Sequence, residues 1–207
     1  MPDWAIALLS AGAASILTIL LREVVEWWRR PRLKIDFEEV DGQKPYILDL
    51  EWESDKAALA GKTPRVKFVR LNVHNAGQKP ALDCEAKLVI FERGNREPVV
   101  PIIRWSRRDY LVYKTLDQQY APIHLNRSDD ETLELLMLHY YAEETDLPPD
   151  VVILSKSFRR HFFRRNVPYL LQVTVYASNA VSKPFWLELY WDGTLEGFNK
   201  AVKIGKG

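Results

Sequence analysis

The feature that most constrains the fold is an uncharged apolar run near the N-terminus. It reads WAIALLSAGAASILTILL, from Trp4 to Leu21, and none of its 18 residues carries a charge. At about 1.5 Å of rise per residue, a helix of this length is roughly 27 Å long, close to a hydrocarbon thickness of about 30 Å. The run therefore predicts one N-terminal transmembrane helix, with residues 1–30 forming the helix and its basic juxtamembrane end.

The residues that flank this run are typical of a membrane interface. Tryptophan prefers that zone because its ring is apolar and its N–H is polar, and arginine places its charge among the headgroups. Pro31 is expected to end the helix, since proline pushes the preceding residue out of the helical region. The predicted membrane-interface residues are Trp4, Trp27, Trp28, Arg29, Arg30 and Arg32.

Positive charge predicts the orientation of the helix. Arg22, Arg29, Arg30, Arg32 and Lys34 lie near or beyond its C-terminal end, whereas only the α-amino group and Asp3 precede it. Because the side rich in Lys and Arg normally stays in the cytoplasm, we expect a single-pass cell-membrane protein with its N-terminus outside and its C-terminal domain cytoplasmic. The lone cysteine, Cys84, agrees with a reducing compartment. The sequon Asn126-Arg127-Ser128 points weakly the other way.

Other interpretations of the apolar run stay open. A cleavable signal peptide would need a basic region before residue 4, and a buried helix of the soluble domain is compatible with the many alanines, glycines and serines. Small residues recur every four positions at Ala7, Ala11 and Ser15, a spacing that permits close helix–helix approach. A homodimer through the transmembrane helix is one partner arrangement that this spacing allows.

Beyond residue 30 the pattern changes to alternation. Every second residue is apolar in Leu82–Ile90, in Leu171–Ala177 and in Phe185–Trp191, and a period of two indicates half-buried strands. Residues 31–207 are therefore predicted to be one all-β domain, an antiparallel β-sandwich of about seven to nine strands. The segment 128–140 is ambiguous, because Ser128-Asp129-Asp130-Glu131 has the form of a helix capping box while Leu133, Leu135 and Met137 alternate.

The stretch LNVHNAGQKPALDCEAKLVIFER resembles a strand pair found in immunoglobulin-like β-sandwich domains of uncharacterised prokaryotic single-pass membrane proteins. The matching features are Asn75, Gly77, Ala81 and Cys84: a strand that ends in Asn-x-Gly, a turn, an alanine and a strand that carries a cysteine. The resemblance covers roughly residues 66–190. It implies an immunoglobulin-like sandwich and a strand at 128–140, and it implies no activity, since fold alone does not fix function.

The chain offers few signs of catalysis. The net charge is +1, there are nine glycines, and the motifs of phosphate-binding loops, dinucleotide folds and nucleophile elbows do not occur. His74, His124, His139 and His161 have no metal-binding spacing, and Cys84 lies on the apolar face of its predicted strand. We therefore predict no catalytic residues, no cofactor and no metal, and a protein that is not an enzyme.

One stretch is unusual: SFRRHFFRRN, residues 157–166. Arginines bind phosphates bidentately and aromatic rings stack on bases or enter a lipid interface, so Arg159, Arg160, Arg164 and Arg165 are candidate anion-binding residues. As a short helix the stretch would place Phe158 and Phe162 on one side. A solvated loop or short helix that packs its phenylalanines on the sandwich explains the same residues. With a membrane anchor nearby, anionic lipid ranks above nucleic acid as a ligand.

The predicted function is a membrane-tethered, non-enzymatic interaction or scaffolding module. Its partners would be the lipid bilayer and a protein that the sequence does not identify. One alternative is nucleic-acid or anionic-lipid binding through residues 157–166. Another is an enzyme whose site is assembled from scattered His, Asp and Glu residues.

Overall fold

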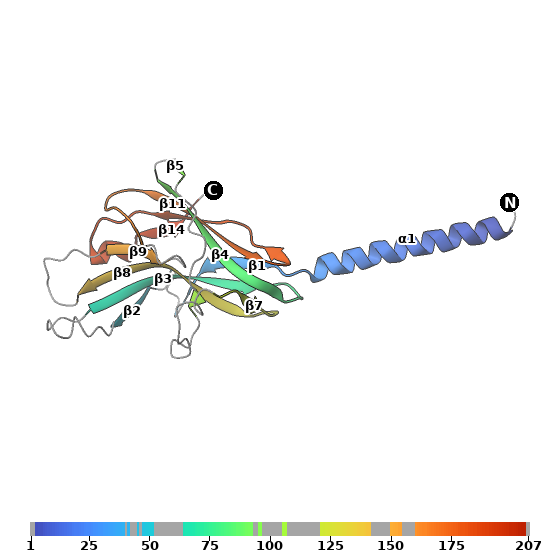
Figure 1. Cartoon of the computed structure of the whole chain (residues 1–207), viewed down its shortest axis with the longest axis horizontal. Helices are drawn as coiled ribbons and strands as arrows, with labels where there is room; N and C mark the ends of the chain where they lie inside the picture. The colour runs from blue at the N-terminus through green and yellow to red at the C-terminus, as the bar shows by residue number, and fades with distance from the viewer. Residues whose placement is uncertain are drawn as a thin grey trace.

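The computed structural model describes residues 3–39, 41, 45, 47–51, 64–92, 95–96, 105–106, 121–141, 150–154 and 160–205. A single long helix projects from one end of a body built of β-strands (Figure 1). The helix and the strands meet only at that end, which we call the helix-proximal end. The opposite end of the sandwich is called the far end.

The helix, α1, runs from Asp3 to Arg29, 27 residues that are rich in alanine and leucine. It ends two residues before Pro31, which is buried, in agreement with the expected effect of a proline. The structure describes the side chains of α1 from Ser15 onward. Among the described residues, no helix is long and apolar enough to cross a membrane.

The first sheet has seven strands, and all of its pairings are antiparallel. Its main path is β1-β3-β8-β9-β10, with β2 also paired to β3 and β6 to β8. The longest contact joins β3 and β8, whose register shifts once, between Val69 and Arg70. The strands are β1 (Leu33–Phe37), β2 (Ile47–Glu51), β3 (Pro64–Asn75), β6 (Trp105–Ser106), β8 (Asp130–Tyr141), β9 (Asp150–Leu154) and β10 (Arg160–Phe162).

The second sheet also has seven strands and is antiparallel. Its path is β14-β13-β11-β4-β5, with β12 paired to β11 and β7 to β4. A single-turn helix, α4 (Leu195–Phe198), connects β13 to β14 and is capped by Thr194. The strands are β4 (Ala81–Glu92), β5 (Asn95–Arg96), β7 (Ile123–Leu125), β11 (Tyr169–Ala177), β12 (Ala180–Val181), β13 (Phe185–Leu189) and β14 (Val202–Ile204).

One hydrophobic core joins the inner faces of the two sheets. Leu71 and Leu133 of the first sheet lie in the same buried cluster as Leu88, Ile90 and Val173 of the second. At one edge the rings of Phe37 and Phe185 meet edge to face, with centroids 5.8 Å apart. The fold is thus all-β, two antiparallel sheets packed as a sandwich, as the alternation predicted.

The predicted antiparallel strands are present, but the number of strands was underestimated. The described residues form fourteen strands where seven to nine were expected, and eight of the fourteen have at least five residues. Residues 130–141 form strand β8, so alternation, and not the capping box, predicted this segment correctly. Residues 160–162, considered above as part of a short helix or loop, are instead strand β10, paired with β9.

Candidate functional site

The exposed apolar surface of α1 is the first unusual feature of the molecule. Its large apolar side chains from residue 16 onward are between 42% and 62% exposed, whereas the sandwich buries most of its own. Contiguous apolar surface of this kind marks a membrane or protein contact. From Ser15 onward, the large apolar side chains of α1 are therefore not buried against the sandwich. The exposed residues are Ile16, Leu17, Ile19, Leu20, Leu21, Val24, Val25, Trp27 and Trp28.

A short, hydrogen-bonded joint connects α1 to the sandwich. Three residues, 30–32, separate the end of α1 from the start of β1. The turn between β3 and β4 closes on them: Lys79 N donates to Arg29 O at 2.9 Å, and Ala76 N donates to Arg32 O at 2.9 Å. Lys79 also forms an ion pair with Glu26, in the last two turns of the helix. The helix therefore leaves the sandwich through a braced connection, without a free linker.

Asn75, the last residue of β3, organises this joint. Its side chain is fully buried. Its Oδ1 accepts hydrogen bonds from Arg32 N at 3.2 Å and from Gly77 N at 3.0 Å. Its Nδ2 donates to Lys79 O at 3.0 Å and to Leu125 O at 2.9 Å. One carboxamide thus uses both donors and both acceptor positions to join the helix exit, the β3–β4 turn and strand β7.

Gly77 lets the turn approach the helix exit closely. A β-carbon at this position would lie 2.4 Å from Arg30 O and 2.6 Å from both Arg32 N and Pro31 Cα. These neighbours are backbone atoms, which cannot rotate away as a side chain does. The Asn-x-Gly pattern of the sequence therefore has a structural role: the asparagine supplies the hydrogen bonds, and the glycine supplies the space.

The structure places five of the six predicted interface residues around the joint. Trp27 and Trp28 are 62% and 55% exposed. Arg29, Arg30 and Arg32 are exposed beside them, and the Arg32 guanidinium lies 5.8 Å from the centre of the Trp27 ring. The side chain of Trp4 lies outside the described residues. Aromatic and cationic groups thus share one zone at the end of the apolar surface.

Of the predicted arginine cluster, the structure describes the side chains of Arg164 and Arg165. Arg159 lies outside the described residues, and of Arg160 only the backbone, in β10, is described. Arg164 and Arg165 are exposed after β10, and the Arg165 guanidinium lies 5.5 Å from the centre of the Trp191 ring. Phe163 is buried, as expected if the phenylalanines pack on the sandwich. The prediction of a four-arginine anion site therefore extends beyond the described residues.

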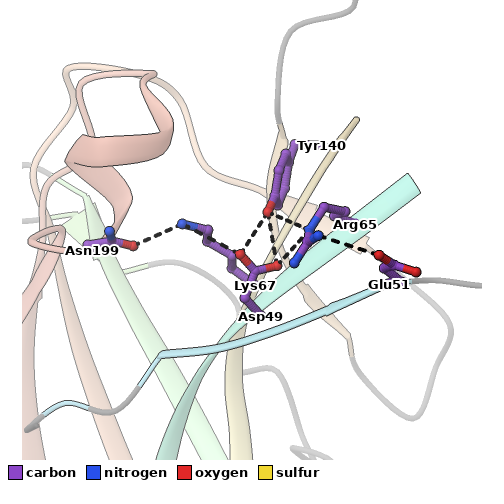
Figure 2. A network of polar contacts seen from close by, with 6 residues as sticks. All are labelled: Asp49, Glu51, Arg65, Lys67, Tyr140 and Asn199. Atoms are coloured by element: carbon purple, nitrogen blue, oxygen red, sulfur yellow. Dashed lines mark hydrogen bonds and ion pairs between the residues drawn. The ribbon is translucent and has the colours of Figure 1, made fainter. Parts of the chain in front are cut away.

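A network of hydrogen bonds and ion pairs lies toward the far end of the sandwich. Its members are Asp49, Glu51, Arg65, Lys67, Tyr140 and Asn199 (Figure 2). Arg65 Nε lies 3.2 Å from Asp49 Oδ1 and 3.1 Å from the Tyr140 hydroxyl, and that hydroxyl donates to the Asp49 carboxylate at 2.8 Å. Lys67 Nζ reaches across to Asn199 Oδ1 of the second sheet's last connection, at 3.3 Å. The network therefore ties β2, β3 and β8 to the segment that follows α4.

The protonation of this network suits a structural role. Burial, followed by the hydrogen bond to Asp49, raises the pKa of the Tyr140 phenol, so the hydroxyl keeps its proton. The hydrogen bond to Asp49 likewise raises the pKa of Arg65. A general base or nucleophile would need the opposite change in the tyrosine, because only the phenolate accepts a proton or attacks.

In the described part of the chain, His74, His124 and Cys84 have separate surroundings. His74 Nδ1 lies 2.7 Å from Asp130 Oδ1, and His124 Nδ1 accepts from Asp83 N at 3.1 Å. The described part of the chain contains no group of three or more His, Cys, Asp or Glu side chains that could hold a metal ion. Burial raises the pKa of the Cys84 thiol to about 11, which makes it inert at neutral pH.

Comparison with known proteins adds no relative. No family model, no curated protein and no solved structure matches the chain.

Proposed function

We propose that the protein is a membrane-tethered, non-enzymatic interaction module. Helix α1 anchors it in the bilayer with the N-terminus outside, and an immunoglobulin-like sandwich is held at the cytoplasmic surface. The observation that supports this most strongly is the apolar side chains of α1, which remain exposed up to the joint. Leaving a large apolar side chain in water rather than burying it costs about 1.5–3 kcal/mol, and nine such residues need a cover.

A bilayer supplies that cover with the right dimensions. A helix of 27 residues is roughly 40 Å long, whereas the hydrocarbon core measures about 30 Å. The helix is therefore longer than the hydrocarbon core by about two helical turns. These extra turns would leave Trp27, Trp28 and Arg29 in the headgroup zone. The uncharged run of residues 4–21 then lies within the hydrocarbon, and the ion pair of Glu26 with Lys79 lies at its edge.

The sandwich provides the interaction surface. Strand β14 is the last strand on one side of the second sheet's path, and its Ile204 is 60% exposed. An edge strand with an exposed apolar side chain can accept an extended peptide by adding a strand. Tethering raises the local concentration of this edge for partners that share the membrane. With an exposed edge strand and a membrane tether, the protein would act as a scaffold for a membrane-bound protein partner.

A labelling experiment tests the anchor and the orientation together. Lys200 is exposed at the far end, so Lys200→Cys offers a thiol to a membrane-impermeant maleimide, and buried Cys84 serves as the internal thiol that labels only after denaturation. We expect protection of the new thiol in intact cells, labelling after lysis, and retention in the membrane pellet after alkaline carbonate. Release by carbonate would reject the anchor, and labelling in intact cells would reverse the orientation.

A further inference from the structure

The joint has a groove beside it that the sequence did not indicate. The groove has a volume of about 730 Å³ and lies between β1 and the β12–β13 connection. It begins at Pro31, two residues after α1 ends, and its walls include apolar side chains from both sheets. If α1 is the anchor, this groove opens where the chain leaves the lipid headgroups.

Three cationic side chains line the groove, and they come from distant parts of the chain. Arg32 and Lys34 belong to the helix exit and β1, and Lys183 belongs to the β12–β13 connection. All three are exposed. Within the described part of the chain, no carboxylate forms an ion pair with any of them, although Arg65, Lys67, Arg70 and Lys79 all have acidic partners. Folding thus gathers three unpaired positive charges at one concave surface.

The acidic groups of the groove are already engaged. Asp36 Oδ1 accepts a hydrogen bond from its neighbour's N–H, Phe37 N, at 2.8 Å. Asp130 Oδ1 lies 2.7 Å from Nδ1 of the lining residue His74. Among the Lys, Arg, Asp and Glu side chains of the lining, Arg32, Lys34 and Lys183 carry positive charge and Asp36 carries negative charge, which gives a net charge of +2. An anionic ligand is therefore the electrostatic complement of this groove.

We propose that this groove binds the phosphate of an anionic phospholipid headgroup in the leaflet that α1 leaves; the proposal rests on the membrane anchor proposed above. Arg32, Lys34 and Lys183 would surround the phosphate, with Arg32 able to bind two of its oxygens at once. The apolar wall, which includes Val181, Pro184 and Phe185, fits the glycerol and upper acyl carbons. The bound lipid would fix the rotation of the sandwich about the helix axis.

Lysine footprinting on the full-length protein tests the proposal. The protein is reconstituted in phosphatidylcholine bilayers with increasing fractions of phosphatidylglycerol, and acetylation of each lysine is followed by mass spectrometry. We expect phosphatidylglycerol to protect Lys34 and Lys183, and to leave Lys200 and Lys203 as reactive as in phosphatidylcholine alone. Equal protection in both lipids, or equal protection of Lys200 and Lys203, would overturn the proposal.

A pair of matched arginine variants separates the groove from general surface charge. Arg32→Gln removes a groove cation, whereas Arg127→Gln removes an exposed cation from the turn before β8, outside the groove lining. A basic residue near an anionic surface changes its affinity by about fivefold. Arg32→Gln should therefore raise the phosphatidylglycerol fraction needed for half-protection about fivefold, and Arg127→Gln should leave it unchanged. Equal shifts would overturn the groove as the site.

Two further measurements test whether the phosphate belongs to a lipid or is free, and whether α1 anchors the protein in the bilayer. Inorganic phosphate is added to the protein in pure phosphatidylcholine; protection of Lys34 and Lys183 at concentrations matching the headgroups would identify a free-phosphate site and overturn the lipid. Alkaline carbonate extraction of the same bilayers reports the anchor alone. If the protein resists extraction but shows no lipid-dependent protection, the anchor is supported and the groove proposal is rejected. If the protein is extracted, the proposed function is rejected.

Discussion

The carboxamide oxygen of Asn75 accepts a hydrogen bond from the backbone N–H of Arg32, across 43 positions of sequence, at 3.2 Å. This contact sits where the helix meets the sandwich. Both the end of β3 and the start of β1 are therefore fixed by one buried side chain.

Asn75→Ala should destabilise the sandwich by about 2–4 kcal/mol. The substitution leaves two N–H groups and two carbonyls without partners at a buried site, and each unsatisfied group costs about 1–3 kcal/mol before relaxation and water entry. Urea unfolding followed by tryptophan fluorescence measures the loss. Asn179→Ala is the matched control, since Asn179 also bonds a backbone N–H, of Leu82, and a carbonyl, of Pro80, but is exposed. A loss at Asn75 no larger than that at Asn179 would contradict the role assigned to the joint.

Gly77→Ala should loosen the joint. The new methyl group would meet backbone atoms of residues 30–32 at 2.4–2.6 Å, so the helix exit must move away from the turn. We expect about 1–3 kcal/mol of destabilisation, as for overpacking elsewhere, and a broader distribution of spin-label distances between α1 and the sandwich. Gly205→Ala, whose nearest contact is 3.2 Å, is the control. An unchanged distance distribution would mean that the joint is not rigid.

If α1 anchors the protein as proposed, Ile19→Asp should release the protein from membranes. A carboxylate within a spanning helix costs about 2.5–3.5 kcal/mol on insertion scales, which lowers the inserted fraction. Ile204→Asp is the control, because Ile204 on β14 is 60% exposed and Ile19 is 61% exposed. The measurement is the membrane-bound fraction after alkaline carbonate. Equal fractions for both variants would show that exposure alone, and not insertion of α1, governs the behaviour.

Tyr140→Phe should cost about 1 kcal/mol, because Asp49 and Arg65 lose the hydroxyl that lies between them. The far end of the sandwich would loosen first, which amide hydrogen exchange of β2 and β8 can detect. Tyr190→Phe removes a hydroxyl that is bonded only to the exposed Asn166, so a few tenths of a kcal/mol are expected there. The prediction fails if the two variants unfold at the same urea concentration.

Cys84 should make the stability fall at alkaline pH. Burial raises the pKa of its thiol to about 11 in the folded state, whereas the unfolded thiol titrates near about pH 8.5. The contribution is therefore complete below about pH 8.5 and is lost as the pH rises from there through 11, because the unfolded chain releases its proton first. Between pH 8 and 10.5 the wild type should lose stability faster than Cys84→Ala, by on the order of 1 kcal/mol per pH unit.

Parallel stability curves for wild type and Cys84→Ala over that range would contradict the raised pKa. A second readout uses a thiol reagent at pH 8: the folded protein should react slowly, and the urea-unfolded protein at once. In the first measurement, the titrating groups that the two proteins share cancel when the Cys84→Ala curve is subtracted from the wild-type curve.

The sequence predicted those parts of the fold that depend on local pattern. The unbroken apolar run indicated α1 because a helix satisfies its own backbone, and alternation indicated β4 and β11 because side chains of a strand alternate between two faces. Strand β8 was ambiguous, since residues 128–131 can cap a helix. Its pairing with β3 along eleven positions decides the conformation, and pairing is a property of two distant segments.

The sites depend more on tertiary structure than the strands do. Asn75 stands out in the sequence only as part of an Asn-x-Gly turn, and its four partners come from three separate segments. The groove unites Arg32 with Lys183, which no periodicity connects. The conspicuous arginines of residues 157–166 drew attention by composition, yet the described part of that stretch is a short strand followed by two exposed arginines.

The connection between α1 and β1 is short, so the orientation of the helix and the orientation of the sandwich are coupled. With three braced residues between them, the sandwich must follow any tilt of the helix. If α1 spans the bilayer as proposed, it tilts where its apolar stretch exceeds the hydrocarbon thickness, and the 18-residue run of roughly 27 Å does so only in thin bilayers. Strand β3, with 12 residues at about 3.3 Å each, extends roughly 40 Å, so a tilt of about 10° would displace the far end by about 7 Å. In the anchored arrangement proposed above, the position of the far end would thus change with the thickness of a thin bilayer.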